Sequence, residues 1–262
     1  MDVVLLRFDA PLMSFGSVVV DQHNRTDPLP YRAMLTGLVA NALGVSRRQA
    51  ADIAALQGRI RYAARRDRRG SIIVDYQTVD FDPEGPMAAD LGWTTRGRLE
   101  ERRGGEASDG THIRFRHYLA DAIVTVALTL VPAGADPSLR RISDALRAPA
   151  RPLFFGRKCC LPSGPVWLGE TATTTLREAL EHTPRAGGLR GGEPSRSDAE
   201  GLQAVWPREE GGEGTTETRL WARVEDRDLE NSVHVGQRIY VEGLVNPPGV
   251  GDVNADSSTE RT

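Results

Sequence analysis

The chain has 262 residues, of which 39% are hydrophobic, and a formal net charge of −3 at pH 7. This length supports one sizeable core, or two small cores that share an interface. No run of about 18 apolar residues occurs, so we expect no membrane-spanning helix. The first residues have neither a basic segment nor a small-residue cleavage site, so a secretory signal is not expected and we predict a cytoplasmic protein.

The charge is distributed unevenly along the chain. Residues 193–262 carry 15 acids and 7 arginines, a net charge of −8, which leaves +5 for residues 1–192. Lys158 is the only lysine, so nearly every cation is arginine. Arginine binds phosphate through a bidentate fork and stacks on bases, but codon bias in a GC-rich genome gives the same enrichment. Both explanations stay open at this point.

Apolar patterning in the first third of the chain predicts strands that alternate with helices. Gly44 is expected to end the first helix, and Ser46 to cap the second. We expect a strand over residues 3–8, polar loops up to residue 30, helices over 31–44 and 46–58, and strands over 59–67 and 71–81.

The rest of the chain begins with a Gly-, Glu- and Arg-rich stretch over residues 82–112, too long for an ordinary loop. Further elements follow it. We expect a strand over 125–131, a helix over 138–149, short strands over 152–156 and 165–169, a helix over 175–182, a loop over 183–218, and a terminal strand pair over 218–226 and 237–245.

The order of these elements, β-α-β-β-α-β, predicts an α+β fold with a ferredoxin-like sheet. RNA-recognition modules bind single strands on the open face of such a sheet. We therefore expect a ferredoxin-like palm formed by residues 1–79 and 114–182, a thumb insertion over 80–113, a C-terminal loop and strand pair over 183–245, and a disordered tail over 246–262.

The two cysteines, Cys159 and Cys160, are adjacent. A zinc site needs about four ligands, usually in two separated pairs, and a disulfide between neighbours is strained. No base that could activate a nucleophile can be assigned from the sequence. We expect both cysteines to be small packing residues at the end of a strand, and we expect no metal and no cofactor.

Three basic clusters give a stronger signal. Residues 59–69 contain six arginines, residues 114–119 interleave arginine with aromatics, and residues 156–158 place two cations after a glycine. Such segments suit phosphate neutralisation and base stacking, although a charge run is also typical of a solvated surface. His117 beside Tyr118 could perform general acid–base chemistry on RNA, or could be structural.

A series of segments in one order carries a family resemblance: "RFDAPLMSFG", "RTDPLPYRAMLTGLVANALG", "DYQTV", "RHYLADAIVTVAL" and "PLFFGRKCCLPSGPVWLG". The series resembles the CasD-type family, the backbone-capping subunits of type I-E CRISPR Cascade complexes, within the RAMP superfamily. The resemblance covers residues 3–192. It departs from the family at Met13–Gly16, at residues 30–34, where the usual Ser-Gly pair is lost, and at Cys159 and Leu161, where serine and proline are usual.

The resemblance implies a non-catalytic RNA-binding subunit in antiviral defence. Its expected partners are the 5′ handle of CRISPR RNA, the backbone subunit CasC, the large subunit CasA and, through the complex, target DNA. The alternative is a metal-independent endoribonuclease that processes CRISPR RNA. The expected RNA-binding residues are Arg25, Arg32, Tyr76, Arg116, Tyr118, Arg157 and Lys158, and the expected partner-binding residues of the thumb are Leu91, Trp93, Arg96 and Arg98.

Overall fold

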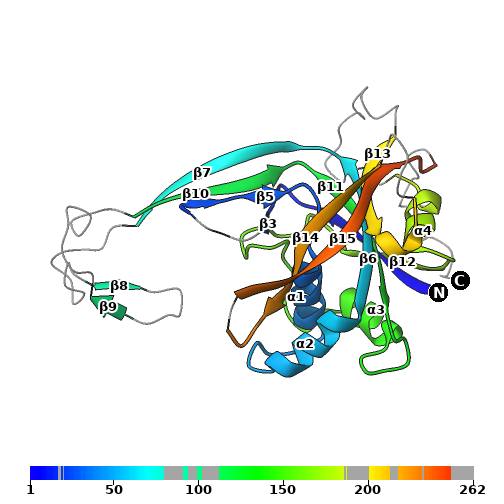
Figure 1. Cartoon of the computed structure of the whole chain (residues 1–262), viewed down its shortest axis with the longest axis horizontal. Coiled ribbons are helices and arrows are strands. Elements are labelled where there is room, and N and C mark those ends of the chain that lie inside the picture. The colour runs from blue at the N-terminus through cyan, green and yellow to red at the C-terminus, as the bar shows by residue number, and fades with distance from the viewer. Residues whose placement is uncertain are drawn as a thin grey trace, which may run out of the picture.

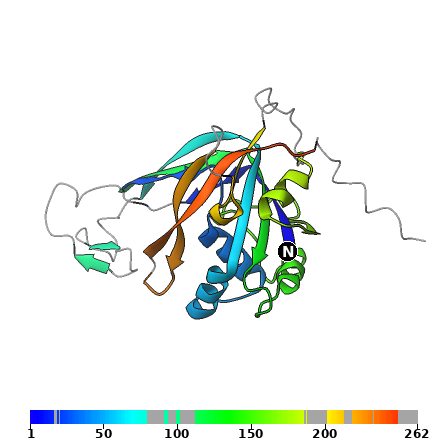
Figure 2. The same cartoon turned by 45° about the vertical axis from the view of Figure 1, so that its right-hand side comes forward.

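The structure, a computed structural model, describes residues 1–16, 19, 21–79, 91–93, 99–101, 112–185, 187, 201–212, 218–231 and 233–248. A mixed α/β body carries an arm that leaves it on one side (Figure 1). The arm is formed by strands β7 and β10, and it projects from the body in the turned view as well (Figure 2). None of the described helices has both the length and the apolar character that a membrane crossing requires.

The body is built on a seven-stranded sheet in which all neighbouring strands run antiparallel. Strands β1 and β11 lie inside it and are buried over nearly their whole length, which explains their continuous apolar sequences. The order across the sheet is β12 (Trp167–Ala172), β1 (Asp2–Asp9), β11 (Ile123–Leu130), β6 (Ile60–Arg68), β13 (Leu202–Pro207), β15 (Val233–Val245) and β14 (Arg219–Asp228).

Within the described residues, four helices cover the two faces of this sheet. Helices α1 (Arg32–Ala42), α2 (Ala50–Arg59) and α3 (Leu139–Arg147) pack on one face around the larger hydrophobic core. Helix α4 (Leu176–His182) packs on the other face over a smaller core. Helices packed on an antiparallel sheet give a mixed α and β structure, which agrees with the α+β class predicted from the sequence.

A second sheet forms the arm and its base. Its central strand β10 (His112–Ala120) pairs antiparallel with β7 (Ser71–Val79) along its whole length. Near the body, β10 also pairs with two short strands, β2 (Leu12–Met13), which runs antiparallel, and β4 (His23–Asn24), which runs parallel. The remaining short elements are β3 (Phe15–Gly16), β5 (Thr26–Asp27), β8 (Leu91–Trp93), β9 (Leu99–Glu101) and the 3-10 helix η2 (Arg208–Glu210).

Several local predictions are confirmed and others are wrong. Gly44 follows α1 with φ +77°, as expected of a residue after a helix end. Ser46 does not cap α2: it opens a turn in which Gln49 N donates to its carbonyl (2.9 Å), and the helix begins after Gln49. Residues 152–156 form no strand, and β13 lies within a segment that we expected to be a loop.

Candidate nucleic-acid interface

A cleft of about 610 Å³ lies between α1, the loop around Gly156 and the hairpin formed by β14 and β15. Its walls therefore come from three distant parts of the chain. The polar and charged residues that line it are Ser14, Asn24, Arg25, Tyr31, Thr36, Asn41, Arg47, Gln57, Arg151, Arg157, Arg227 and His234.

The cleft is strongly cationic. Five arginines line it and, among the described residues, no aspartate or glutamate does. Arg47 and Arg227 are close enough that the charge of Arg47, together with the larger effect of burial, lowers the pKa of Arg227. Like charges held together in this way favour the binding of a polyanion, because phosphates relieve the repulsion.

Small side chains keep the cleft open along α1. Ala33, Gly37 and Asn41 recur at intervals of four residues, which places them on one side of the helix, and all three line the cleft. A Cβ atom added at Gly37 would meet no atom within 4 Å. Glycine inside a helix is less stable than alanine, so helix propensity does not explain Gly37. What Gly37 provides is room beside the helix, because it has no side chain.

The loop that forms the second wall depends on Gly156. This residue has φ +88°, and a Cβ atom added to it would lie 1.8 Å from the carbonyl oxygen of Ser14. The neighbouring Phe155 accepts a hydrogen bond from Ser14 N (3.1 Å) and donates one to the carbonyl of Cys160 (2.8 Å). Only glycine permits this close backbone approach, which presents Arg157 at the cleft.

Arg157 connects the loop to the second sheet. Its Nη1 donates to the carbonyl of His117 (3.1 Å), and its Nη2 donates to the carbonyl of Asn24 (3.0 Å). Its guanidinium also lies 4.4 Å above the ring of Tyr118. The side chain is therefore held in place while it still lines the cleft, which is the arrangement of a preorganised phosphate ligand.

An aromatic row runs along the second sheet beside the cleft. Phe115 on β10 lies opposite Tyr76 on β7 and opposite His23 on β4, so the three side chains share one face. The ring of Phe115 is stacked on His23 at 4.6 Å and meets the edge of Tyr76 at 5.5 Å. His117 continues the row, 5.9 Å from His23. Tyr76 is 56% exposed and offers a surface on which a base can stack.

His117 lies where the aromatic row meets the arginines. Burial lowers the pKa of its imidazole, and the nearby charges of His23, Arg25 and Arg157 lower it further, with a smaller opposing effect of Asp21. Its Nε2 atom is buried without a hydrogen-bond partner among the described residues. The imidazole is therefore mainly neutral at pH 7, and a bound phosphate would favour its protonation.

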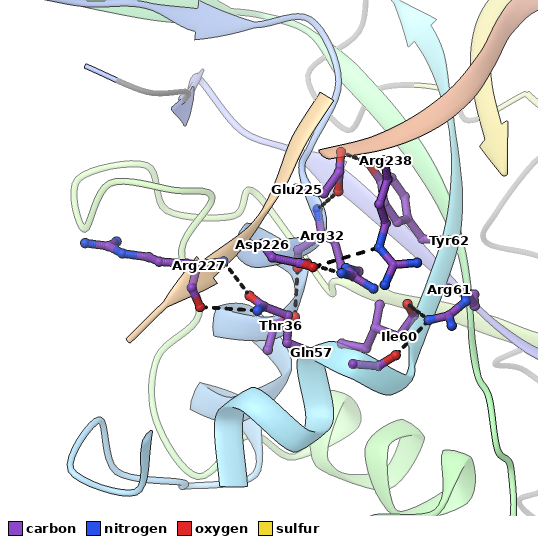
Figure 3. Close-up of polar contacts among 11 residues, drawn as sticks. Arg32, Thr36, Gln57, Ile60, Arg61, Tyr62, Glu225, Asp226, Arg227 and Arg238 are labelled. Carbon is purple, nitrogen blue, oxygen red and sulfur yellow. Dashed lines mark hydrogen bonds and ion pairs between the residues drawn. The ribbon is translucent and has the colours of Figure 1, made fainter. Parts of the chain in front are cut away.

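A buried polar network fixes the hairpin that forms the third wall (Figure 3). Glu225 accepts hydrogen bonds from the backbone N of Arg32 (2.5 Å) and from the hydroxyl of Tyr62 (2.9 Å). Gln57 on α2 exchanges two hydrogen bonds with the backbone of Arg227, at 3.1 and 3.2 Å. Burial raises the pKa of Glu225, against the opposing effects of Arg223 and these hydrogen bonds. The hairpin is thus attached to both helices.

The structure divides the residues that the sequence analysis proposed for RNA binding. Arg25 and Arg157 line the cleft, Lys158 is exposed beside Arg157, and Tyr76 belongs to the aromatic row. Arg116 is half-buried and, by strand alternation, lies on the opposite face of β10 from Phe115.

Two of the proposed residues are buried. Arg32 is 1% exposed and pairs with Asp226, and Tyr118 is 4% exposed beneath Arg157. Neither side chain is accessible for the contact that we expected, so we exclude both from the interface. Their burial follows from their positions at the first residue of α1 and at the base of the arm. Leu91 and Trp93 belong to β8, whose side chains are not described, and Arg96 and Arg98 lie outside the described residues.

The two cysteines differ in environment. Cys160 is fully buried in the larger core, as expected, and burial raises the pKa of its thiol to about 12. Cys159 is exposed, with its Sγ atom 3.7 Å from the hydroxyl of Tyr118, so the prediction that it packs inside is wrong. Both lie in a turn rather than at a strand end. Among the described residues, no group of three or more His, Cys, Asp or Glu could hold a metal ion.

The sequence analysis did not identify three of the five cleft arginines. It also did not predict that the two histidines of the aromatic row lie close together. Arg47, Arg151 and Arg227 stand in three separate segments, outside any basic cluster. Only the packing of α1 against the hairpin and the Gly156 loop brings them together. Strand pairing does the same for His23 and His117, which are far apart in the sequence.

A cationic cleft beside a row of half-buried rings that ends in the exposed Tyr76 has the chemistry of nucleic-acid-binding proteins. Comparison with known proteins gives the family. The profile of the family described as "CRISPR-associated protein (Cas_Cas5)" matches residues 3–242, and the chain belongs to this family.

A curated relative, "CRISPR system Cascade subunit CasD" of Escherichia coli (strain K12), is 28% identical over 193 residues, which cover 71% of this chain and 78% of the relative. Two solved structures share the fold. A chain of a "CRISPR RNA-guided surveillance complex" has a TM-score of 0.61 at 23% identity, with 97% of this chain and 95% of that chain covered. "Crystal structure of Cas protein" has a TM-score of 0.59 at 25% identity, with 95% of this chain and 100% of that chain covered.

Proposed function

We propose that this chain is a subunit of a type I-E CRISPR surveillance complex of the Cascade kind, which binds the 5′ handle of the CRISPR RNA and caps one end of the backbone. It binds RNA and does not cut it. Its protein partners are the backbone subunit CasC and the large subunit CasA, and it reaches target DNA through the complex. Membership of the family and the CasD relative support this assignment.

The observation that carries the proposal is the charge of the cleft. Five arginines face a space of about 610 Å³ without a described carboxylate among its lining residues. Each arginine that neutralises a phosphate of a single strand releases counterions, and the logarithm of affinity then falls with the logarithm of salt by about 0.7 per contact. Five contacts therefore predict a salt slope of about −3.5. The aromatic row beside the cleft offers stacking to the bases.

The fold supports the finer description of palm and thumb. Strands β12, β1, β11 and β6, in that order and all antiparallel, together with α1 and α3, have the connectivity of a ferredoxin-like palm. We assign the thumb to residues 80–113, which the paired strands β7 and β10 would carry away from the palm. This arrangement would let the thumb reach an adjacent backbone subunit.

A pair of neighbouring arginines allows a matched test of RNA binding. Arg47 lines the cleft, whereas Arg48 is exposed and is not among the lining residues. Binding of handle RNA should weaken in Arg47→Gln and its salt slope should fall by about 0.7, while Arg48→Gln should behave as the wild type. Fluorescence anisotropy across a salt series measures both quantities. Equal losses in the two variants would mean that net charge, and not the cleft, determines binding.

The capping role is tested separately on the thumb. A short Gly-Ser bridge that replaces residues 84–110 should leave the palm folded but prevent co-purification with CasC and CRISPR RNA. Trp93→Ala should weaken assembly in the same direction, because a buried tryptophan at an interface typically contributes about 2 kcal/mol or more. Thermal melting of the isolated subunit serves as the folding control. A normal yield of complex from the bridged variant would overturn the capping role.

One observation favours a second candidate function, a metal-independent endoribonuclease. His23 and His117 lie 5.9 Å apart next to Arg25 and Arg157, and two imidazoles beside cations could act as acid and base on RNA. Incubation of the purified chain with a repeat RNA hairpin, without metal, distinguishes the two functions. We expect no product. A specific product that disappears in His117→Ala would establish the nuclease instead.

A further inference from the structure

The cleft is closed at one end, where the C-terminal end of α1 lies. The segment that follows α3 is bonded directly to this end of the helix. Ala150 N donates to the carbonyl of Ala42 (2.9 Å), and Asn41 Nδ2 donates to the carbonyl of Pro152 (2.7 Å). A Cβ atom added to Gly44 would lie 3.1 Å from the Cβ atom of Ala150, so the two segments are in contact. No strand of nucleic acid can pass between them.

The hairpin and α2 close the side of this end. Gln57 is 8% exposed and exchanges two hydrogen bonds with the backbone of Arg227, at 3.1 and 3.2 Å (Figure 3). Gln57 and Ile53 both line the cleft, so α2 forms its wall here. Arg25 and Arg157 line the cleft at the opposite end, beside the second sheet. A strand that enters between these two arginines and follows α1 therefore meets a wall.

Three arginines surround the closed end, and each comes from a different part of the chain. Arg47 lies on the loop between α1 and α2, Arg151 lies after α3, and Arg227 lies near the end of β14. Arg151 is held in place, because its two Nη atoms donate to the carbonyls of Gly44 (2.8 Å) and Val45 (3.0 Å). Arg47 and Arg151 are exposed and Arg227 is half-buried, so all three are accessible to a ligand.

Positive charge and apolar surface meet at the closed end. His234 lies opposite Arg227 on the hairpin and also lines the cleft. Burial lowers the pKa of its imidazole, and the charge of Arg227 lowers it further. Val45 and Leu229 pack against the larger core and line the cleft beside these cations. A nucleotide has the matching division, since it joins an anionic phosphate to a base whose face packs on apolar groups.

We infer that the closed end of the cleft holds the 5′-terminal nucleotide of the RNA, with the adjoining phosphate on Arg47, Arg151 and Arg227. The terminal base lies against the apolar side chains of this end. The inference rests on the proposed handle-binding function, which supplies the RNA and its 5′ end. It narrows the substrate class to RNA whose handle begins at a free 5′ end. In an RNA with further nucleotides before the handle, the wall blocks the path, and only the open end of the cleft can bind it.

Handle RNAs that are extended at one end or the other test this pocket. Fluorescence anisotropy on the full chain compares the handle with free ends, the handle with a few uridines added at its 5′ end, and the handle with the same uridines at its 3′ end. The 5′ extension should weaken binding about tenfold or more, because contacts to the closed-end arginines are lost. The 3′ extension adds the same charge and should leave the affinity of the handle unchanged.

Arg47→Gln and Arg157→Gln distinguish the two ends of the cleft. Arg47→Gln should weaken binding of the free-ended handle but leave binding of the 5′-extended RNA unchanged, because that RNA does not reach the closed end. Arg157→Gln should weaken binding of both RNAs by the same factor, because both pass the open end. Thermal melting of each variant without RNA serves as the folding control.

The outcomes separate this inference from the function on which it rests. If the free-ended handle does not bind, the handle-binding function itself is wrong. If the handle binds and its 5′ extension binds equally well, or if Arg47→Gln weakens both RNAs alike, the terminal pocket alone is wrong. If the 3′ extension weakens binding and the 5′ extension does not, the assignment of the 5′ end to this pocket is wrong.

Discussion

Gly37 allows a test of whether the space beside α1 holds RNA. It lies in the middle of the helix, it is exposed towards the cleft, and a side chain added there meets no atom within 4 Å. Gly37→Ala should therefore raise the free energy of unfolding by about 0.5–1 kcal/mol, which is the helix cost of glycine. In a protein of this size we expect a rise in Tm of about 1–4 °C. Handle binding should stay close to the wild-type level.

Gly37→Glu should separate stability from binding. Glutamate is also a good helix former, so the fold should be at least as stable as the wild type. Its carboxylate, however, enters a cleft that has five arginines on its walls. At about 8 Å from a phosphate, with an effective dielectric constant of about 40, the repulsion is about 1 kcal/mol, and neutralisation of an arginine adds to it. Handle affinity should fall at least about fivefold.

Gly58→Glu is the matched control for charge and for helix propensity. Gly58 is an exposed residue of α2, it also has no atom within 4 Å of an added Cβ atom, and it does not line the cleft. Because Gly58 lies in the last turn of the helix, a glutamate there interacts unfavourably with the helix dipole and should lower the stability of the protein by ~0.3–1 kcal/mol. Melting followed by circular dichroism measures this difference. Anisotropy titrations with handle RNA compare the three variants. Equal binding by Gly37→Glu and Gly58→Glu would refute the placement of RNA along α1.

Four further changes probe single contacts. Gly156→Ala should destabilise the fold by about 2–5 kcal/mol in denaturant titrations, because the new Cβ atom would clash with the Ser14 carbonyl and alanine is strained at a positive φ. A loss below about 1 kcal/mol would contradict this geometry. Arg157→Gln should lower the salt slope of handle binding by about 0.7, and an unchanged slope would remove it from the interface. Because the pKa of His117 is lowered in the folded state, the free energy of unfolding should decrease as pH falls below about 6.5, and this part of the decrease should be absent in His117→Gln. If His117 takes up a proton when RNA binds, handle binding should be tighter towards pH 6. Isothermal titration in two buffers of different ionisation enthalpy detects that proton uptake. In the same denaturant titrations, Cys160→Ser should lower the free energy of unfolding by about 1–3 kcal/mol, whereas Cys159→Ser should change it by less than about 0.5 kcal/mol. The reverse order would contradict the structure, in which Cys160 is buried and Cys159 is exposed.

The sequence predicts most elements of the body because their apolar patterns are strong. Strands β1 and β11 are continuous apolar runs, and α3 lies within the helix expected over 138–149. Strand β13 could not be recognised, since its six residues stand between Gly- and Glu-rich segments and end in Pro207. Only its place between β6 and β15 makes it a strand, and that place depends on tertiary pairing.

The basic cluster at residues 59–69 shows why arginine runs mislead. Arg59 is buried and donates to the carbonyls of Pro132, Ala135 and Pro137. Arg65 is fully buried, pairs with Asp67, and donates to carbonyls at the end of α4. Both side chains satisfy backbone groups that would otherwise be buried without partners, so they are structural. Of the five cleft arginines, in contrast, only Arg157 belongs to one of the basic clusters seen in the sequence, and only the fold brings it together with the other four.

The hydrogen bond between Arg32 and Glu225 joins residues 193 positions apart, and it has a consequence for synthesis. Two walls of the cleft come from α1 and from the loop around Gly156, but the third wall comes from residues 224–234 of the hairpin. A chain that emerges from the ribosome N-terminus first can fold its early strands and helices before this last hairpin exists. A nascent chain would therefore expose its arginines to cellular RNA before the cleft is complete, and it could not bind RNA tightly. Stable loading with RNA should begin only after translation is nearly complete.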